Sequence, residues 1–169
     1  TAKGGLDLHQ SPNTLTIDIT PVNDAPSGAD NTVTTLEDTA KTLAAADFGF
    51  SDAADSPANA LAAVKITTLP ASGSLTLNGV AVTAGQLVSV ADINSGLLVY
   101  TPAANATADA SFTFQVQDDG GTANGGVDLD QSPNTLTIDI TPVNDAAIDL
   151  IFTFTQIPGN SLPNGTFGQ

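Results

Sequence analysis

Apolar and polar residues alternate in several short stretches of the chain, which is the pattern of half-buried β-strands. The clearest case is Asn134–Thr141, where Leu136, Ile138 and Ile140 alternate with polar residues. The same criterion, with Gly, Pro, Asn and Ser turns between the stretches, predicts further strands at 32–36, 61–69, 74–77, 80–82, 87–90, 97–101 and 111–117. Residues 39–46 form a second strand or a short irregular segment.

Turn signals are as frequent as the strands. Asn78-Gly79 is the strongest short hairpin signal, and residues 91–93 allow one helical turn capped by Asp92. No longer segment has a helical period, so we expect an all-β fold, an antiparallel β-sandwich of about seven strands. Its predicted core contains Phe48, Phe50, Val64, Ile66, Leu75, Leu77, Leu98, Tyr100, Phe112, Phe114, Leu136 and Ile138.

One stretch, QSPNTLTIDITPVNDA, occurs twice, at 10–25 and at 131–146. The match extends over 1–24 and 122–145 with only three differences, so the chain contains a tandem repeat whose period is a whole domain. We therefore expect a tail of a preceding repeat at 1–24, a complete repeat at 25–145, and the start of another module or a tail at 146–169.

The duplicated strand has a consequence for association. Residues 13–20 alternate like a strand that Pro21 ends, and they are identical to 134–141, so both copies fit the same place in one sandwich. Only one copy can occupy it within a monomer. We expect the C-terminal copy to do so, which leaves the N-terminal copy as an exposed arm or as a strand donated to a neighbour, with self-association as the result.

Charge narrows the function classes. Three Lys, no Arg and eighteen acidic residues give a formal net charge of −15, which disfavours nucleic acid and anionic membranes as partners. Seventeen of the acids are Asp, which suits loops, solubility or hard cations such as Ca²⁺. There is no Cys, no apolar run long enough to span a bilayer, and no signal peptide in 1–20. His9 is the only His, and no catalytic set can be assembled around it, so we expect no enzyme.

A family resemblance rests on two specific runs, ITTLPASGSLTLNGVAVTAGQLVSVADINSGLLVYTP and the terminal TLTIDITPVNDA. Together they resemble the cadherin-like tandem repeats of large bacterial adhesins of the RTX type exported by type I secretion, which are similar to chondroitin-sulfate-proteoglycan repeats. The resemblance covers 10–146. It implies an extracellular, immunoglobulin-like or cadherin-like sandwich that extends an adhesin from the cell surface, in adhesion and biofilm formation, rigidified by Ca²⁺ at domain junctions and packed against neighbouring repeats.

The acidic loops and linkers are the candidate metal ligands. In a sandwich, the loops after the second strand and before the last strand lie at the end where the N-terminal linker enters, and the first strand-to-strand corner lies at the other end. Ca²⁺ takes six to eight oxygen ligands, which such convergent loops supply. The candidates are Asn23, Asp24, Asp52, Asp55, Asp118 and Asp119 at one end, and Glu37, Asp38, Asn144 and Asp145 at the other.

Simpler explanations stand beside this one. Asp and Asn favour turns in any protein, so these residues also fit plain solvated loops. The family often shows an Asp-Ala-Asp-Gly-Asp-like loop, whereas this chain has Asp52-Ala53-Ala54-Asp55 and departs at one ligand position. Asp128 and Asp130 fit loop solvation or a further Ca²⁺ site.

Two other functions remain open. One is a carbohydrate- or surface-binding module with a Ca²⁺-bridged ligand, which would require aromatic residues beside the acidic loops. The other is a fibre subunit assembled by strand exchange.

Overall fold

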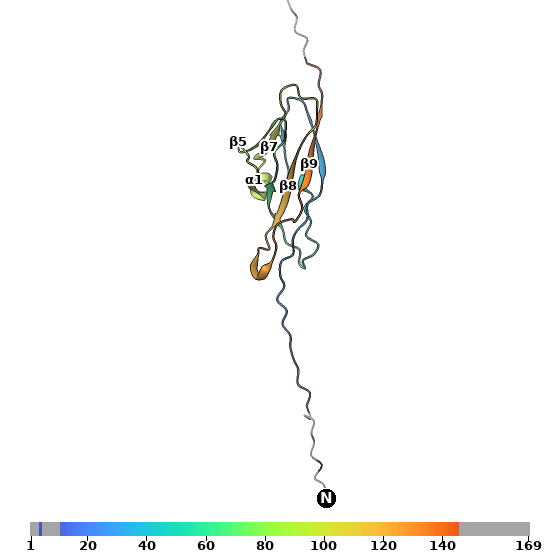
Figure 1. Cartoon of the computed structure of the whole chain (residues 1–169), viewed down its shortest axis with the longest axis vertical. Coiled ribbons are helices and arrows are strands. Elements are labelled where there is room, and N and C mark those ends of the chain that lie inside the picture. The colour runs from blue at the N-terminus through green and yellow to red at the C-terminus, as the bar shows by residue number, and fades with distance from the viewer. Residues whose placement is uncertain (1–3, 5–10, 146–169) are drawn as a thin grey trace, which may run out of the picture.

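The computed structural model describes residue 4 and residues 11–145, and two β-sheets pack face to face in it (Figure 1). The predicted β-sandwich is confirmed. It has more strands than the seven or so expected, and several of them are very short. The elements of the described residues are β1 (Asn31–Leu36), β2 (Lys41–Thr42), η1 (Ala45–Phe48), β3 (Leu61–Ile66), β4 (Ser74–Leu77), β5 (Val80–Ala81), β6 (Leu87–Ser89), α1 (Val90–Asn94), β7 (Leu98–Thr101), β8 (Ala110–Asp118), η2 (Ala123–Gly125) and β9 (Asn134–Thr141).

The sheets have the orders β1-β9-β8-β3-β6 and β2-β7-β4-β5. Every pair is antiparallel except β1 and β9, which run parallel with Val33 opposite Ile138, so the prediction of an antiparallel sandwich needs this correction. The parallel pair has a simple geometric meaning. The first and last strands of the sandwich point the same way, so the chain enters at one end and leaves at the other (Figure 1).

Alternating residues of both sheets meet in one hydrophobic core. The rings of Phe48 and Phe114 pack edge to face, with centroids 4.9 Å apart and an angle of 80°. Tyr100 is completely buried, and its hydroxyl donates to the carbonyl oxygen of Ser72 over 3.0 Å. Of the predicted core residues, only Phe50 and Leu77 lie at its margin, partly buried.

Two local details became clear only in the structure. Of the two alternatives for 39–46, the short irregular segment fits better, because the chain forms only two residues of strand there and then turns into the 3₁₀ helix η1. The predicted cap of the helical turn, Asp92, was wrong. Helix α1 is capped by Ser89, whose side-chain oxygen accepts from the backbone N–H of Asp92 over 3.1 Å. Asp92 lies inside the first turn, where its carboxylate accepts from the Ser89 hydroxyl over 2.7 Å. Ser is as good a cap as Asp, so local sequence could not choose between them.

The two copies of the duplicated strand adopt different conformations. The C-terminal copy is β9, hydrogen-bonded between β1 and β8. The N-terminal copy, residues 13–20, is extended but belongs to no sheet, and it leads away from the sandwich at the end opposite to the one where the chain continues after β9 (Figure 1). We call residues 13–20 the arm. The alternating pattern predicted a strand in the arm, but no strand of the described residues pairs with it.

The helices within residues 11–145 are far too short to cross a membrane. The second module or tail predicted at 146–169 lies outside the described residues.

Candidate metal site at the linker

Residues 21–26, the linker before β1, pack against the loops at the end of the sandwich where the chain enters. The side-chain amide of Asn23 donates to the carboxylate of Asp118 (3.1 Å) and to the carbonyl oxygen of Val127 (2.8 Å). The backbone N–H of Val127 donates back to the carbonyl oxygen of Asn23 over 2.9 Å. Next along the chain, the N–H of Asp24 donates to the Asp55 carboxylate over 3.0 Å. The linker is therefore held by side chains and backbone alike.

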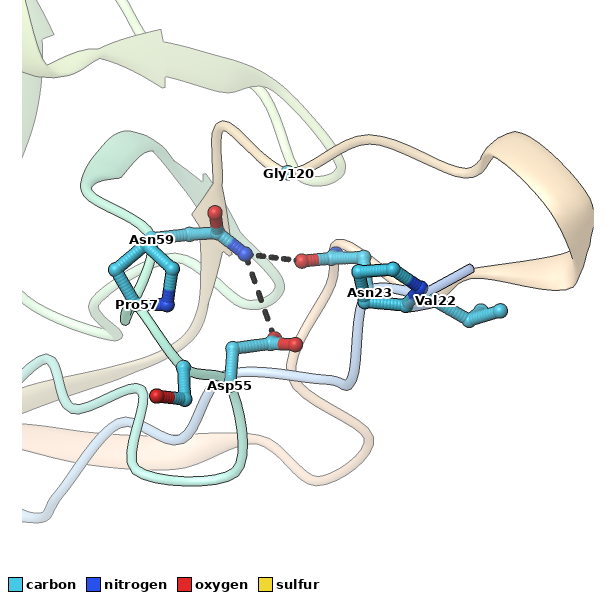
Figure 2. A pocket seen from close by; sticks show the side chains of 8 residues that line it. Val22, Asn23, Asp55, Pro57, Asn59 and Gly120 are labelled. Carbon is cyan, nitrogen blue, oxygen red and sulfur yellow. Dashed lines mark hydrogen bonds between the residues drawn. The ribbon is translucent and has the colours of Figure 1, made fainter. Parts of the chain in front are cut away.

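Asn59 ties the loop after η1 to this linker, as Figure 2 shows. Its backbone N–H donates to Oδ2 of Asp52 over 2.5 Å, and its side-chain amide donates to Oδ1 of Asn23 and, over 3.4 Å, to Asp55. Sequence analysis missed Asn59. It is one amide in an Ala-rich loop, and nothing in its spacing distinguishes it from an ordinary turn residue.

Two carboxylates of this end are buried. Asp52 is 6% exposed and Asp118 is 3% exposed. Oδ1 of Asp52 is enclosed and has no hydrogen-bond partner among the described residues. A buried, unpaired carboxylate oxygen is costly, because it has lost its hydration without gaining a donor. This oxygen is the strongest sign that the site takes something that the protein itself does not supply.

The electrostatics of Asp118 point the same way. Burial raises the pKa of the Asp118 carboxyl above its usual value, and the negative charges of Asp52 and Asp128 add to the rise. The N–H of Gly120, 2.9 Å from Oδ1, and the amide of Asn23 oppose it. A carboxylate that is difficult to ionise beside another acid would be relieved by a nearby cation.

Oxygen ligands are thus available, although carboxylates alone do not complete a site. No group of three His, Cys, Asp or Glu side chains among residues 11–145 is arranged to hold a metal ion. The oxygen atoms beside the linker are the free oxygen of Asp52, the carboxylates of Asp55 and Asp118 and the amide oxygen of Asn23, and such ligands suit Ca²⁺. Asp119 is exposed, and its carboxylate accepts from the N–H of Ala60 over 2.8 Å.

At the opposite end of the sandwich, Glu37 is hydrogen-bonded to the segment at the end of β9 and just after it. It is 4% exposed, its Oε1 accepts from the N–H of Val143 over 2.6 Å, and its own N–H donates to the carbonyl oxygen of Thr141 over 3.0 Å. Asp38 is exposed and accepts from the N–H of Asn105. The remaining candidates at this end, Asn144 and Asp145, are exposed.

Asp130 is not a solvated loop residue, one of the two interpretations considered for it. It is 4% exposed, and its carboxylate accepts from the N–H of Gly28 (2.8 Å), the N–H of Ser132 (3.0 Å) and the amide of Asn134 (2.8 Å). Asp130 therefore fastens the start of β9 to the linker region. Asp128 is half-buried and accepts from the Gln117 amide over 3.0 Å.

A pocket of about 230 Å³ opens beside the docked linker (Figure 2). It is lined by Pro21, Val22, Asn23, Asp55, Ser56, Pro57, Asn59 and Gly120. No aromatic residue is among them. Of the two aromatic residues that precede this loop in sequence, Phe48 is fully buried in the core and Phe50 is partly buried and packs against it. The aromatic platform that a sugar-binding module would need is missing from this pocket.

Comparison with known proteins adds the family. The model of a family described as cadherin-like matches residues 26–127, more than half of the chain. No curated protein and no solved structure matches this chain. The matched range contains both sheets up to the end of β8 and the loops that hold Asp52, Asp55 and Asp118. Cadherin-like domains are non-catalytic and typical of extracellular proteins. The chain belongs to the cadherin-like family.

Proposed function

We propose that this chain is a structural extender repeat of a secreted bacterial adhesin, and that Ca²⁺ bound at the docked linker rigidifies the junction between repeats. Residues 1–24 would then be the end of a preceding repeat, and 25–145 one complete unit. Its role is mechanical: it holds an adhesive part of the protein away from the cell surface, in adhesion and biofilm formation.

The observation that carries the proposal is the free oxygen of Asp52. It lies in the loop that Asn59 fastens to the linker, and Asp118 is buried nearby and bonded to Asn23. A cation held there would tie the linker to two loops of the sandwich at once, and bending at the junction would have to break ligand bonds. The route of the chain supports an extender, because it enters and leaves at opposite ends (Figure 1).

The second end of the unit fits the same scheme. Val143 matches Val22 in the duplicated linker, and Glu37 accepts from the N–H of Val143. In an array, the Glu37 of one repeat would therefore lie against the linker that docks on the next. This would place its carboxylate near the ligands of the following unit, and Asn144 and Asp145 would take the positions of Asn23 and Asp24.

The test is a thermal melt in EGTA and in 10 mM Ca²⁺, with 10 mM Mg²⁺ as the control ion. Extracellular Ca²⁺ sites have dissociation constants of about 10⁻⁴–10⁻³ M, so this concentration stabilises the folded state by about 1.4–2.7 kcal/mol. For a domain of this size we expect a rise in Tm of roughly 5–10 °C with Ca²⁺ and less with Mg²⁺.

Asp52→Asn isolates the site. The substitution removes the charge and turns one oxygen into a donor, so we expect an equal or higher Tm in EGTA and little response to Ca²⁺. Asp139→Asn, on the exposed face of β9, changes the net charge equally and should keep the full response. An unchanged Ca²⁺ shift in Asp52→Asn, or no shift in the parent chain, would refute the site.

A further inference from the structure

The first and last strands of the sandwich form a parallel pair, and the chain enters and leaves this pair at opposite ends. β1 and β9 are paired over six positions, from Asn31 with Leu136 to Leu36 with Thr141. The chain reaches β1 from the linker at one end, and it leaves β9 at the other end (Figure 1). A force that stretches the chain between these ends therefore pulls β1 and β9 past each other along their own length.

The hydrogen bonds between the two strands run across the direction of that force. The N–H of Glu37 donates to the carbonyl oxygen of Thr141 over 3.0 Å. N–H groups point alternately to the two sides of a strand, so those of Thr35 and Val33 also face β9, and that of Thr34 faces away from it. Sliding the strands past each other loads all of these bonds at the same time, whereas separating the strands from one end loads them one after another.

Two acidic side chains extend this ladder of hydrogen bonds beyond both ends of β1. Before β1, Oδ1 of Asp30 accepts from the N–H of Thr135 over 2.7 Å. After β1, Oε1 of the buried Glu37 accepts from the N–H of Val143 over 2.6 Å. Hydrogen bonds to a charged acceptor are stronger than bonds between neutral groups. The two strands are therefore held most firmly at the ends, where the chain is pulled.

β1 depends on β9 for its place in the sheet. It lies at the edge of the five-stranded sheet and is paired with β9 alone, whereas β9 is also paired with β8. Val33 is the buried residue of β1, and it joins the hydrophobic core. Tension along the chain therefore withdraws β1 first, and the β1–β9 pair is what resists this step.

We propose that β1 and β9, with Asp30 and Glu37, form a mechanical clamp that keeps the domain folded while tension passes along the chain. The proposal rests on the proposed function, because tension reaches the unit only where neighbouring parts of a longer protein pull at both ends. It identifies the element that resists the tension. This element contains none of the candidate metal ligands at the linker.

The linker and the clamp are loaded in sequence. The contacts of Asn23, Asp24 and Ser27 precede β1 along the chain, so tension reaches them before it reaches the clamp. They are few and break one after another, which gives a first event at low force. The clamp then takes the full tension, and its rupture unfolds the domain in a second event at high force.

Pulling one domain in two directions tests the clamp. The chain has no Cys, so pairs of introduced cysteines fix the points of attachment for single-molecule force spectroscopy in EGTA. Thr20→Cys with Asp145→Cys slides β1 past β9, whereas Thr39→Cys with Asp145→Cys separates the two strands from the end that bears Glu37; all three residues are exposed. Unfolding is recognised by the gain in length, because each released residue adds about 3.5 Å. We expect a rupture force several-fold higher in the first direction, and equal forces in the two directions would overturn the proposal.

Proline substitutions test the hydrogen bonds themselves. Thr35→Pro removes an N–H that faces β9, whereas Thr34→Pro places the same ring where the N–H faces away. In the first direction we expect Thr35→Pro to lower the rupture force several-fold and Thr34→Pro to stay close to the parent. Val88→Ala, in β6 at the opposite edge of the sheet, lowers stability by removing buried methyl groups and should keep the rupture force.

These variants separate mechanical resistance from overall stability. Forced unfolding reports the unfolding rate along the pulled direction, and urea denaturation reports the equilibrium. Rupture forces that simply follow the urea stability of the three variants would refute the clamp. The comparison of the two directions needs no proline in β1, so it decides the question even if Thr35→Pro does not fold.

The clamp and the cation site can fail separately. Ca²⁺ should raise the force of the first event, at the linker, and should leave the second event unchanged. A difference between the two pulling directions without any response to Ca²⁺ supports the clamp and refutes the cation site. Equal forces in the two directions, together with a rise in Tm on addition of Ca²⁺, refute the clamp and support the cation site.

Discussion

The same residue in the same eight-residue sequence should contribute very differently to stability at its two positions. Ile17 and Ile138 have identical neighbours from residue 10 to 25 and from 131 to 146, yet Ile17 is 76% exposed and Ile138 is completely buried. We therefore compare Ile17→Ala with Ile138→Ala. Local sequence is held constant in this pair, so any difference in stability comes from the tertiary environment alone.

The magnitude follows from burial. Ile138→Ala removes three buried carbon groups at about 0.8 kcal/mol each and leaves a cavity in the core between the two sheets, for a total of about 2–5 kcal/mol. That is a large part of the 5–15 kcal/mol typical of a domain, and it corresponds to a fall in Tm of roughly 8–20 °C. Ile17→Ala removes groups already in water, so its effect should stay within about 0.5 kcal/mol.

The assay is urea denaturation followed by far-UV circular dichroism, because the chain has no Trp. The measurement uses low micromolar protein. We expect the midpoint of Ile138→Ala to fall with an unchanged slope, and that of Ile17→Ala to match the parent. Equal losses in the two variants would show that the arm is packed in solution, and a larger loss in Ile17→Ala would show that the arm, and not β9, occupies the sheet.

Three further predictions concern the two ends of the sandwich. Gly120→Ala should destabilise the fold by about 1–3 kcal/mol and speed proteolysis of the linker, because an added Cβ would overlap the amide of Asn23; protection of the linker equal to that of the parent chain would contradict this. Glu37→Ala should cost about 1–3 kcal/mol in urea denaturation, because the N–H of Val143 loses its acceptor, whereas Glu37→Gln keeps an acceptor and should stay close to the parent. The raised pKa of Asp118 means that the folded state holds this proton more tightly than the unfolded state does. In EGTA, the contribution of this group to stability should therefore fall as the pH rises from the ordinary Asp pKa of 3.8 through the raised pKa. The Tm should then fall less steeply with pH in Asp118→Asn than in the parent chain, and identical profiles would exclude Asp118 as the cause.

Much of the fold could be predicted because local sequence patterns determine where the strands and turns lie. Alternation placed β4 and β9 correctly to the residue, and located β1, β3, β7 and β8 to within a few residues. Hairpin chemistry at Asn78-Gly79 correctly joined β4 to β5. Length and alternation could not show that β1 and β9 run parallel, because the pattern of a strand contains no information about the direction of its neighbour.

The candidate site was predictable in composition and only partly in geometry. The sequence predicted that the linker and the acidic loops meet, and the contacts of Asn23 with Asp118 and of Asp24 with Asp55 place them together. Their role as metal ligands remains a prediction. The bonds of Asn59 and the buried, unpaired oxygen of Asp52 could not be predicted, because they depend on the three-dimensional course of the loops.

The sequence by itself determined that NTLTIDIT is able to form a strand, that it is present twice, and that the chain is acidic, β-rich and repeated. The tertiary structure decided which copy becomes a strand. Residues 134–141 follow β8 through a loop that returns them beside it, whereas residues 13–20 precede a linker that Asn23 and Ser27 hold at the far end of β1. A strand is stable only when partners on both sides or on its face complete its hydrogen bonds and bury its apolar row, and those partners come from distant parts of the chain.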